Sequence, residues 1–315
     1  MNWQGESKFM EKKLIIHEVG PRDGLQVEKT AVPFEEKIKW IDGLAESGVD
    51  IIQLGSFVNP EKVPQMADTD KLFTHYSNPE NKPANVILSG LVLNEKGLDR
   101  GLACGVDMFC MGVSASETHS QKNTGMTPSE AQSRIIPMAI KAMGAGKKVQ
   151  ASVQSAFGCG FEGPIPKEKV MGIVKAYLDA GIRNISLADT AGHANPTQVE
   201  DYFDSILTLD SKVELACHFH NTYGLGLANC YAAMISGVSS LESALGGLGG
   251  CPFTKLPAGN VSTEDLVHSL QRMGLRKDIN LNILLDVARQ VAAFFGRELP
   301  GFILKSGSIV DFHGK

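Results

Sequence analysis

The sequence predicts a (β/α)8 barrel, in which eight parallel strands close into a ring and eight helices cover its outside. Short runs rich in Val, Ile and Leu alternate along the chain with longer amphipathic stretches, which is the pattern of β–α units around a parallel sheet. Eight such pairs fit a closed barrel. The turn at 19–24, VGPRDG, lacks the G-x-G-x-x-G fingerprint of the competing open, doubly wound sheet.

Each predicted strand is a short run bounded by polar or turn residues. The strands are expected at residues 14–18, 51–55, 85–91, 107–113, 149–155, 184–188, 214–220 and 240–245. The helices are expected at residues 34–47, 63–74, 95–103, 128–143, 166–180, 196–207, 226–236 and 263–272. Thr127-Pro128 and Ser262 are typical helix starts, and Gly48, Gly181 and Gly237 are typical helix ends. The barrel should therefore occupy residues 13–274, with a helical extension at 275–315, in a single domain.

Composition excludes several classes of function. The 315 residues are 43% hydrophobic and carry a net charge of −5, and Lys and Arg are scattered, so no nucleic-acid partner is expected. No apolar run approaches the roughly 20 residues that span a bilayer, and the N-terminus does not resemble a targeting signal. The six cysteines lack a C-x-x-C pair, which favours reduced thiols, mostly in the core. We expect a cytoplasmic protein with no membrane partner.

Reactive residues gather where the strands of such a barrel end, which is where barrel active sites lie. His218 and His220 are two residues apart on a predicted strand, so both imidazoles should point to one face about 6.5 Å apart. Asp23 follows the first strand and should lie near them. Two imidazoles and a carboxylate suit a divalent metal. A structural or solvent-facing histidine pair is the alternative.

Two further features lie at the same mouth. Arg22 stands in a tight turn that could aim its guanidinium at a carbonyl or carboxylate, although a plain loop cation is the alternative. Residues 246–250 hold four glycines and end at Cys251. A mobile loop that brings a thiol to a metal site is a plausible proton donor, and a merely flexible loop is the alternative. Cys159, in the loop after the fifth strand, could approach the same mouth.

Several motifs resemble those of the 3-hydroxy-3-methylglutaryl-CoA lyases, within the superfamily of metal-dependent barrel lyases and Claisen synthases. The motifs are EVGPRDGLQ at 18–26, SFV at 56–58, SASE at 114–117, HFHNTYG at 218–224, GLGGCP at 247–252 and GN at 259–260. The resemblance covers roughly residues 13–274. The glycine–cysteine loop is its most specific motif.

The resemblance implies a set of site residues. Asp23, His218, His220 and Asn260 fall on the family's ligands for Mg²⁺ or Mn²⁺, and Glu264 and Asn221 on positions that support the site. Arg22, Asp189, His218 and Cys251 fall on catalytic positions. Substrate-binding positions are matched by Arg22, Gln53, Ser56, Ser114 and Ser116.

The implied reaction is a retro-Claisen cleavage of 3-hydroxy-3-methylglutaryl-CoA to acetyl-CoA and acetoacetate, as in leucine breakdown and ketone-body metabolism. An acyl-CoA substrate and a homo-oligomer are expected. Three positions depart from the family: Gln53 replaces a glutamate, Asn221 an aspartate and Gly55 a threonine. Gln53 should leave the mouth about one charge unit more positive and favour an acyl group that carries its own anion.

Three other functions remain in view. A lyase for another 3-hydroxyacyl-CoA, such as a citramalyl or a longer branched thioester, would use the same residues. Isopropylmalate- or homocitrate-type synthases share the barrel and the paired histidines, but they typically begin with a Thr-Leu-Arg-Asp-Gly turn, whereas residues 20–24 read GPRDG. A non-catalytic barrel would not need the full set of metal-ligand residues.

Overall fold

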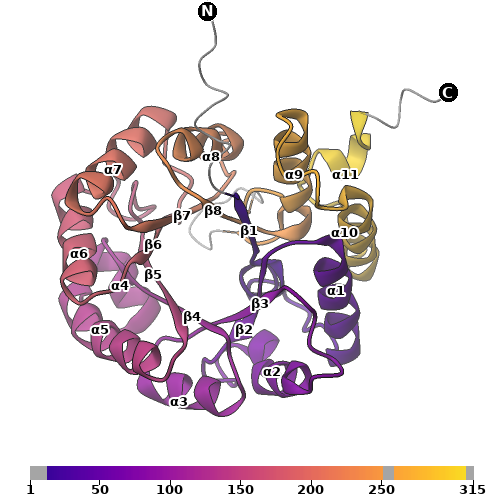
Figure 1. The fold of residues 1–315 in the computed structure, drawn as a ribbon, viewed down its shortest axis with the longest axis horizontal. Coiled ribbons are helices and arrows are strands. Elements are labelled where there is room, and N and C mark those ends of the chain that lie inside the picture. The colour runs from indigo at the N-terminus through magenta and orange to yellow at the C-terminus, as the bar shows by residue number, and fades with distance from the viewer. Residues whose placement is uncertain (1–12, 251–258, 310–315) are drawn as a thin grey trace, which may run out of the picture.

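The computed structural model describes residues 13–250 and 259–309. It confirms the predicted fold, because eight parallel strands pair in chain order and β8 pairs with β1 to close the barrel (Figure 1). The strands are β1 (Ile15–Glu18), β2 (Ile51–Ser56), β3 (Ile87–Leu91), β4 (Met108–Ser114), β5 (Lys148–Gln154), β6 (Asn184–Asp189), β7 (Glu214–Phe219) and β8 (Ser240–Ser243). All eight predicted strands exist, with bounds shifted by one or two residues.

The helices ring the outside of the barrel (Figure 1). They are α1 (Phe34–Ser47), α2 (Thr69–Ser77), α3 (Glu95–Ala103), α4 (Glu117–Thr124), α5 (Pro128–Gly144), α6 (Lys167–Asp179), α7 (Pro196–Leu209), α8 (Gly226–Ile235) and α9 (Thr263–Arg272). Short helical turns are η2 (Gly20–Gly24), η3 (Pro64–Met66) and η4 (Leu245–Gly247). The expected capping at Thr127 is present, since its hydroxyl accepts the Glu130 N–H and the Glu130 carboxylate accepts the Thr127 N–H.

Two helices differ from the prediction. The helix expected at 63–74 begins only at Thr69, because side chains occupy carbonyl groups of the preceding turn. Lys37 Nζ donates to the Gln65 carbonyl at 2.7 Å, and Thr69 Oγ1 donates to the Met66 carbonyl at 2.8 Å. Helix α4 was not predicted. Its residues ETHSQKNT are almost all polar, so they give no apolar stripe, although Ser116 caps its start and Gly125 ends it in the left-handed region.

The C-terminal extension is helical, as expected, with α10 (Leu281–Phe295) and α11 (Ile303–Ser306). Helix α10 packs on α1, where Trp40 and Phe294 meet edge to face with ring centroids 5.5 Å apart. Arg276, just before α10, donates to the Leu14 carbonyl and to the Asp50 carboxylate, both at 2.6 Å. The extension is thereby tied to the amino ends of β1 and β2.

Among the described helices, none combines the length and the apolar character needed to cross a bilayer. The inward side chains of the barrel matter more for function. Strand register places His17 beside Glu242, Glu242 beside His218, and Cys110 beside Gln150. These polar positions form the inner wall of the barrel beneath its carboxyl-terminal mouth.

Candidate active site

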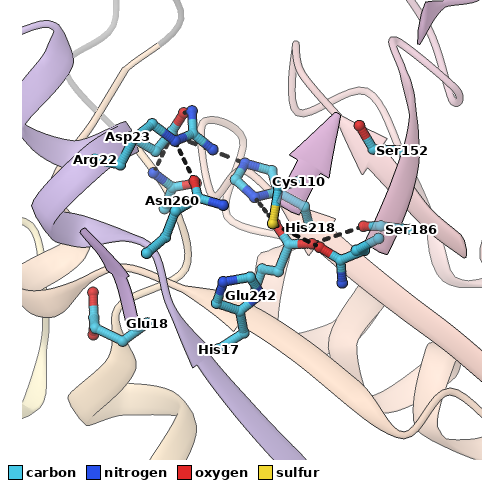
Figure 2. A network of polar contacts seen from close by, with 12 residues as sticks. His17, Glu18, Arg22, Asp23, Cys110, Ser152, Ser186, His218, Glu242 and Asn260 are labelled. Carbon is cyan, nitrogen blue, oxygen red and sulfur yellow. Dashed lines mark hydrogen bonds and ion pairs between the residues drawn. The ribbon is translucent and has the colours of Figure 1, made fainter. Parts of the chain in front are cut away.

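A cavity of about 580 Å³ opens at the carboxyl-terminal ends of the strands, the place where barrel enzymes carry their sites. Its lining includes the predicted residues Arg22, Asp23, Gln53, His218 and His220. Figure 2 shows Arg22, Asp23 and Asn260 gathered on one side of His218. The cavity therefore lies where the reactive residues were predicted from the sequence.

Three candidate metal ligands come together. His218 lies on β7 and His220 directly after it, with ring centroids 5.3 Å apart. Asp23 belongs to η2, whose tight turn is fixed where the Asp23 N–H donates to the Val19 carbonyl at 2.7 Å. One ligand atom from each of the three lies within 4.8 Å of the others. This spacing lets a single ion reach all three.

Asn260, the fourth predicted ligand, lies beside this trio. An isolated β-bridge pairs its backbone with that of His220. Its Nδ2 donates to Asp23 Oδ2 at 2.8 Å and to the Leu248 carbonyl at 2.9 Å, whereas its buried Oδ1 has no partner. The Asn260 Oδ1 atom is therefore available to bind a metal ion.

The electrostatics keep Asp23 and His220 in the protonation states that bind a metal. Burial would raise the pKa of Asp23, but Arg22, His218 and His220 together hold it well below its usual range. Burial, reinforced by the neighbouring His218, lowers the pKa of His220 to about 4. An ionised carboxylate and a neutral imidazole are the protonation states that bind metals.

Glu242 on β8 is a site residue that the sequence analysis missed. Its Oε2 lies 3.0 Å from His218 Nδ1, and its Oε1 accepts the Ser186 hydroxyl at 2.9 Å (Figure 2). Burial disfavours charge on both partners, yet their contact raises the pKa of His218 and lowers that of Glu242. A carboxylate behind a histidine fixes its tautomer and turns Nε2 towards a metal. The available signal was an acidic residue in the middle of a short strand, SLES.

Arg22 is held over the cavity by two neighbours. Its Nε donates to Gln53 Oε1, and its Nη1 pairs with Asp23 Oδ1. Gln53 thus positions the guanidinium through a neutral hydrogen bond. Asp23 compensates the positive charge of Arg22. Asp23 is also one of the candidate metal ligands.

Asp189 ends β6 and is fully buried. Its Oδ1 accepts the His193 N–H at 2.8 Å and its Oδ2 accepts the Ala194 N–H at 3.1 Å. Burial raises its pKa to about 6 against the lowering effect of these N–H groups. The carboxylate shapes the turn after β6, and its part in proton transfer stays a prediction.

The three predicted serines lie in different settings. Ser56 lines the cavity, and its buried hydroxyl has no partner. Ser114 Oγ accepts the Ser116 N–H at 3.1 Å, and Ser116 Oγ accepts the His119 N–H at 3.1 Å at the start of α4. Ser114 and Ser116 therefore hold the chain between β4 and α4, and substrate contact by any of the three stays a prediction.

Asn221 and Glu264 support backbone near the site. Asn221 Oδ1 accepts the Gly226 N–H at 3.0 Å at the start of α8. Glu264 Oε2 accepts the Gly246 N–H at 2.8 Å and the Ser262 hydroxyl at 2.7 Å. Glu18, which was not predicted as a site residue, accepts the N–H groups of Gly20 and Leu245 at 2.6 and 3.0 Å. Glu18 and Glu264 together anchor η4, which leads into the glycine-rich loop.

Cys251 lies outside the described residues. Gly250, the last described residue before it, lines the cavity. Cys159 is buried, where its sulfur accepts the Ser116 hydroxyl at 3.1 Å. Cys110, expected in the core, is buried but also lines the cavity, and burial raises its pKa to about 12.

The residues fit a divalent ion. Asp23, His218 and His220 offer a carboxylate and two imidazoles at ligand spacing, and the buried Asn260 Oδ1 lacks a partner beside them. Mixed oxygen and nitrogen donors of this kind suit Mg²⁺ or Mn²⁺. Glu242 supplies the outer contact that such a histidine usually has.

Comparisons with known proteins agree with this geometry. A family model described as HMGL-like matches residues 13–291. A hydroxymethylglutaryl-CoA lyase of Bacillus subtilis is 36% identical, covering 92% of this chain and 95% of the relative. An (R)-citramalyl-CoA lyase of Chloroflexus aurantiacus is 35% identical, covering 93% and 95%. The structure of an HMG-CoA lyase from Acinetobacter baumannii in complex with coenzyme A and 3-methylmalate superimposes with a TM-score of 0.88 at 38% identity, covering 96% of this chain and 98% of that one.

Proposed function

The chain belongs to the HMGL-like family, and from this premise we propose that it is a metal-dependent lyase that cleaves a carbon–carbon bond in a 3-hydroxyacyl-CoA. The first substrate proposed is 3-hydroxy-3-methylglutaryl-CoA, which would give acetyl-CoA and acetoacetate, products of leucine breakdown and ketone-body metabolism. The single observation that carries the proposal is the cluster of Asp23, His218 and His220 at the mouth of the barrel.

The reaction needs a deprotonated tertiary alcohol and a stabilised enolate. When bound, Mg²⁺ or Mn²⁺ would lower the pKa of the substrate hydroxyl and orient it. Asp23, His218, His220 and Asn260 are the residues proposed to hold the ion. Arg22, which is aimed into the cavity by Gln53 and Asp23, would stabilise the negative oxygen of the thioester enolate as the bond breaks.

Two proton transfers complete the cycle. Asp189, or His218 when its Nε2 does not hold the ion, would take the hydroxyl proton. For Asp189, a pKa raised to about 6 by burial suits a base that works near neutral pH. Cys251 is proposed to protonate the enolate carbon and so release acetyl-CoA. The support for Cys251 is its place directly after Gly250, which lines the cavity.

A second substrate is favoured by one observation. The (R)-citramalyl-CoA lyase is 35% identical to this chain and the B. subtilis hydroxymethylglutaryl-CoA lyase 36%, so identity does not separate the two substrates. Citramalyl-CoA carries the same thioester and tertiary alcohol, with its carboxylate attached directly to the alcohol carbon instead of through a methylene. The same residues would cleave it to acetyl-CoA and pyruvate.

A panel assay tests the proposal. The purified protein with Mg²⁺ is incubated with 3-hydroxy-3-methylglutaryl-CoA, citramalyl-CoA and a longer branched 3-hydroxyacyl-CoA, and the products are identified by mass. Acetyl-CoA together with the matching keto product is expected from at least one of them. Cleavage of none would refute the lyase assignment, and condensation of acetyl-CoA with a 2-oxo acid would indicate a synthase instead.

A further inference from the structure

Polar side chains form a row across β2 to β5 inside the barrel, below its mouth. Gln53 on β2 pairs in register with Ser89 on β3, and Cys110 on β4 pairs with Gln150 on β5. The row continues from β3 to β4, because Ser89 pairs with Met108, which lies two residues before Cys110 and therefore on the same face of its strand. All four side chains are buried. We call Gln53, Ser89, Cys110 and Gln150 the interior polar row.

The Cys110 thiol connects the members of this row. Its S–H donates to Gln150 Oε1 at 3.6 Å, and its sulfur is hydrogen-bonded to the side chains of Gln53 and Ser89. Ser89 Oγ in turn lies 2.9 Å from Nε2 of the buried His17. Because a thiol has one proton and Gln150 takes it, the sulfur acts as an acceptor towards Gln53.

The orientation of the Gln53 amide decides whether it can hold Arg22. A glutamine amide has an oxygen that only accepts hydrogen bonds and an N–H₂ group that only donates them. Gln53 Oε1 accepts from Arg22 Nε, so the hydrogen bond to Cys110 is made by the N–H₂ group. A flipped amide would place two donors, the Gln53 N–H₂ and the Arg22 Nε–H, against each other. The sulfur of Cys110 therefore supports the one orientation in which Gln53 holds Arg22.

A glutamate at position 53 would not need such a partner. Both oxygens of a carboxylate accept hydrogen bonds, so either one can hold a guanidinium. Glutamine offers only one accepting end. The interior polar row is what presents that end to Arg22.

We propose that Cys110, held by Gln150, is a positioning residue for catalysis, whose sulfur fixes the Gln53 amide so that Oε1 aims the Arg22 guanidinium into the cavity. This role rests on the proposed function, because Arg22 is assigned there to the enolate oxygen. The thiol forms no covalent bond in this role and needs no contact with the substrate. Burial raises its pKa to about 12, so it stays protonated near neutral pH and keeps its S–H for Gln150.

A double-mutant cycle with Gln53→Glu tests this role. Cys110→Ala should lower kcat roughly tenfold on the best thioester of the panel and change KM less than about threefold, since Arg22 acts on charge that forms as the bond breaks. Cys110→Ser keeps a donor and an acceptor and should retain kcat within about threefold. In Gln53→Glu protein the same Cys110→Ala change should lower kcat less than about twofold, because a carboxylate accepts at either end.

Cys104→Ala is the matched control, because it also removes a thiol, but one that lies at the end of α3 and donates to the Gly101 carbonyl. It should keep the wild-type kcat. An equal loss of kcat from Cys110→Ala with glutamine or glutamate at position 53 would overturn the inference, since a packing role alone would give that result. If Cys110→Ala does not fold, Gln150→Leu decides. It frees the S–H to turn towards Gln53 and should lower kcat about threefold or more, but only with glutamine at position 53.

The Arg22 side chain gives a readout that does not require turnover. In protein made with isotope-labelled arginine, the NMR signal of the Arg22 Nε–H is identified by its loss in Arg22→Lys. Cys110→Ala should shift or broaden this signal, and should leave it unchanged in Gln53→Glu protein. An unmoved signal in Cys110→Ala would overturn the inference. The expected shift without cleavage of any thioester would instead overturn the lyase proposal and leave the positioning of Arg22 by Cys110 standing.

Discussion

At the scale of single residues, Glu242 decides how well His218 can hold a metal. Its Oε2 contacts His218 Nδ1 at 3.0 Å, and outer contacts of this kind are worth about 10- to 100-fold in metal affinity. Glu242→Gln should therefore weaken Mn²⁺ binding by roughly that factor, as measured by calorimetry. Glu214→Gln, at the exposed start of β7, should bind Mn²⁺ as the wild type does. Equal affinities for Glu242→Gln and the wild type would remove Glu242 from the site.

Gln53 sets the charge next to Arg22. Gln53→Glu would turn the hydrogen bond to Arg22 Nε into an ion pair and make the mouth one unit less positive. The ratio of kcat/KM for a carboxylate-bearing substrate to that for a neutral one should fall roughly tenfold, which is about 1.4 kcal/mol of differential transition-state binding. If both proteins give the same ratio, Gln53 does not set specificity.

The residues of the metal cluster could be anticipated because strand periodicity places two histidines on one face and barrel closure brings Asp23 to them. Glu242 was missed, since one acidic residue in the four-residue strand SLES does not by itself show which face of the strand is buried. Gln150 was also missed as a residue of the cavity lining, although the alternation of polar and apolar residues along β5 places Gln150, Ser152 and Gln154 on one face.

At the scale of elements, η4 is held by two buried carboxyl groups. Burial, as the largest influence, raises the pKa of Glu18 to about 8 and that of Glu264 to about 7. Each group binds its proton more tightly in the folded than in the unfolded chain. Its contribution to stability is complete below pH 4.5 and is lost as the pH rises through the folded value.

Stability should therefore fall between about pH 4.5 and 8. Thermal unfolding should show a drop in Tm of roughly 5 °C or more over that range for the wild type, and a smaller drop for Glu18→Gln, which cannot ionise. Glu200→Gln, on the exposed face of α7, should follow the wild type. Parallel pH profiles for Glu18→Gln and the wild type would show that Glu18 does not titrate in this range.

Elements were predicted well where apolar periodicity is strong and poorly where it is absent. Helices α1, α3 and α9 have the bounds expected from the sequence. Helix α4 is polar throughout, and only its capping residues, Ser116 and Gly125, indicate it in the sequence. The start of α2 is set by Lys37 from another helix, a tertiary contact that no local pattern contains.

At the scale of the whole molecule, closure of the barrel unites residues far apart in the chain. Asp23 and Asn260, 237 positions apart, share a hydrogen bond of 2.8 Å, and β1 pairs with β8 to bring them together. The expected fold followed from the count of β–α units. The cavity did not, because it depends on which inward side chains are small, such as those of Ser152 and Ala188 in its lining.

The central claim is that one divalent ion at Asp23, His218 and His220 makes this barrel a lyase. The most direct test follows acetyl-CoA by mass from 3-hydroxy-3-methylglutaryl-CoA or citramalyl-CoA, using protein stripped with a chelator and the same protein with Mg²⁺ or Mn²⁺ restored. We predict loss of turnover on stripping, recovery on adding either ion, and at least about 100-fold less activity for His220→Ala with the ion present. Full turnover by the stripped protein, or by His220→Ala, would contradict the claim.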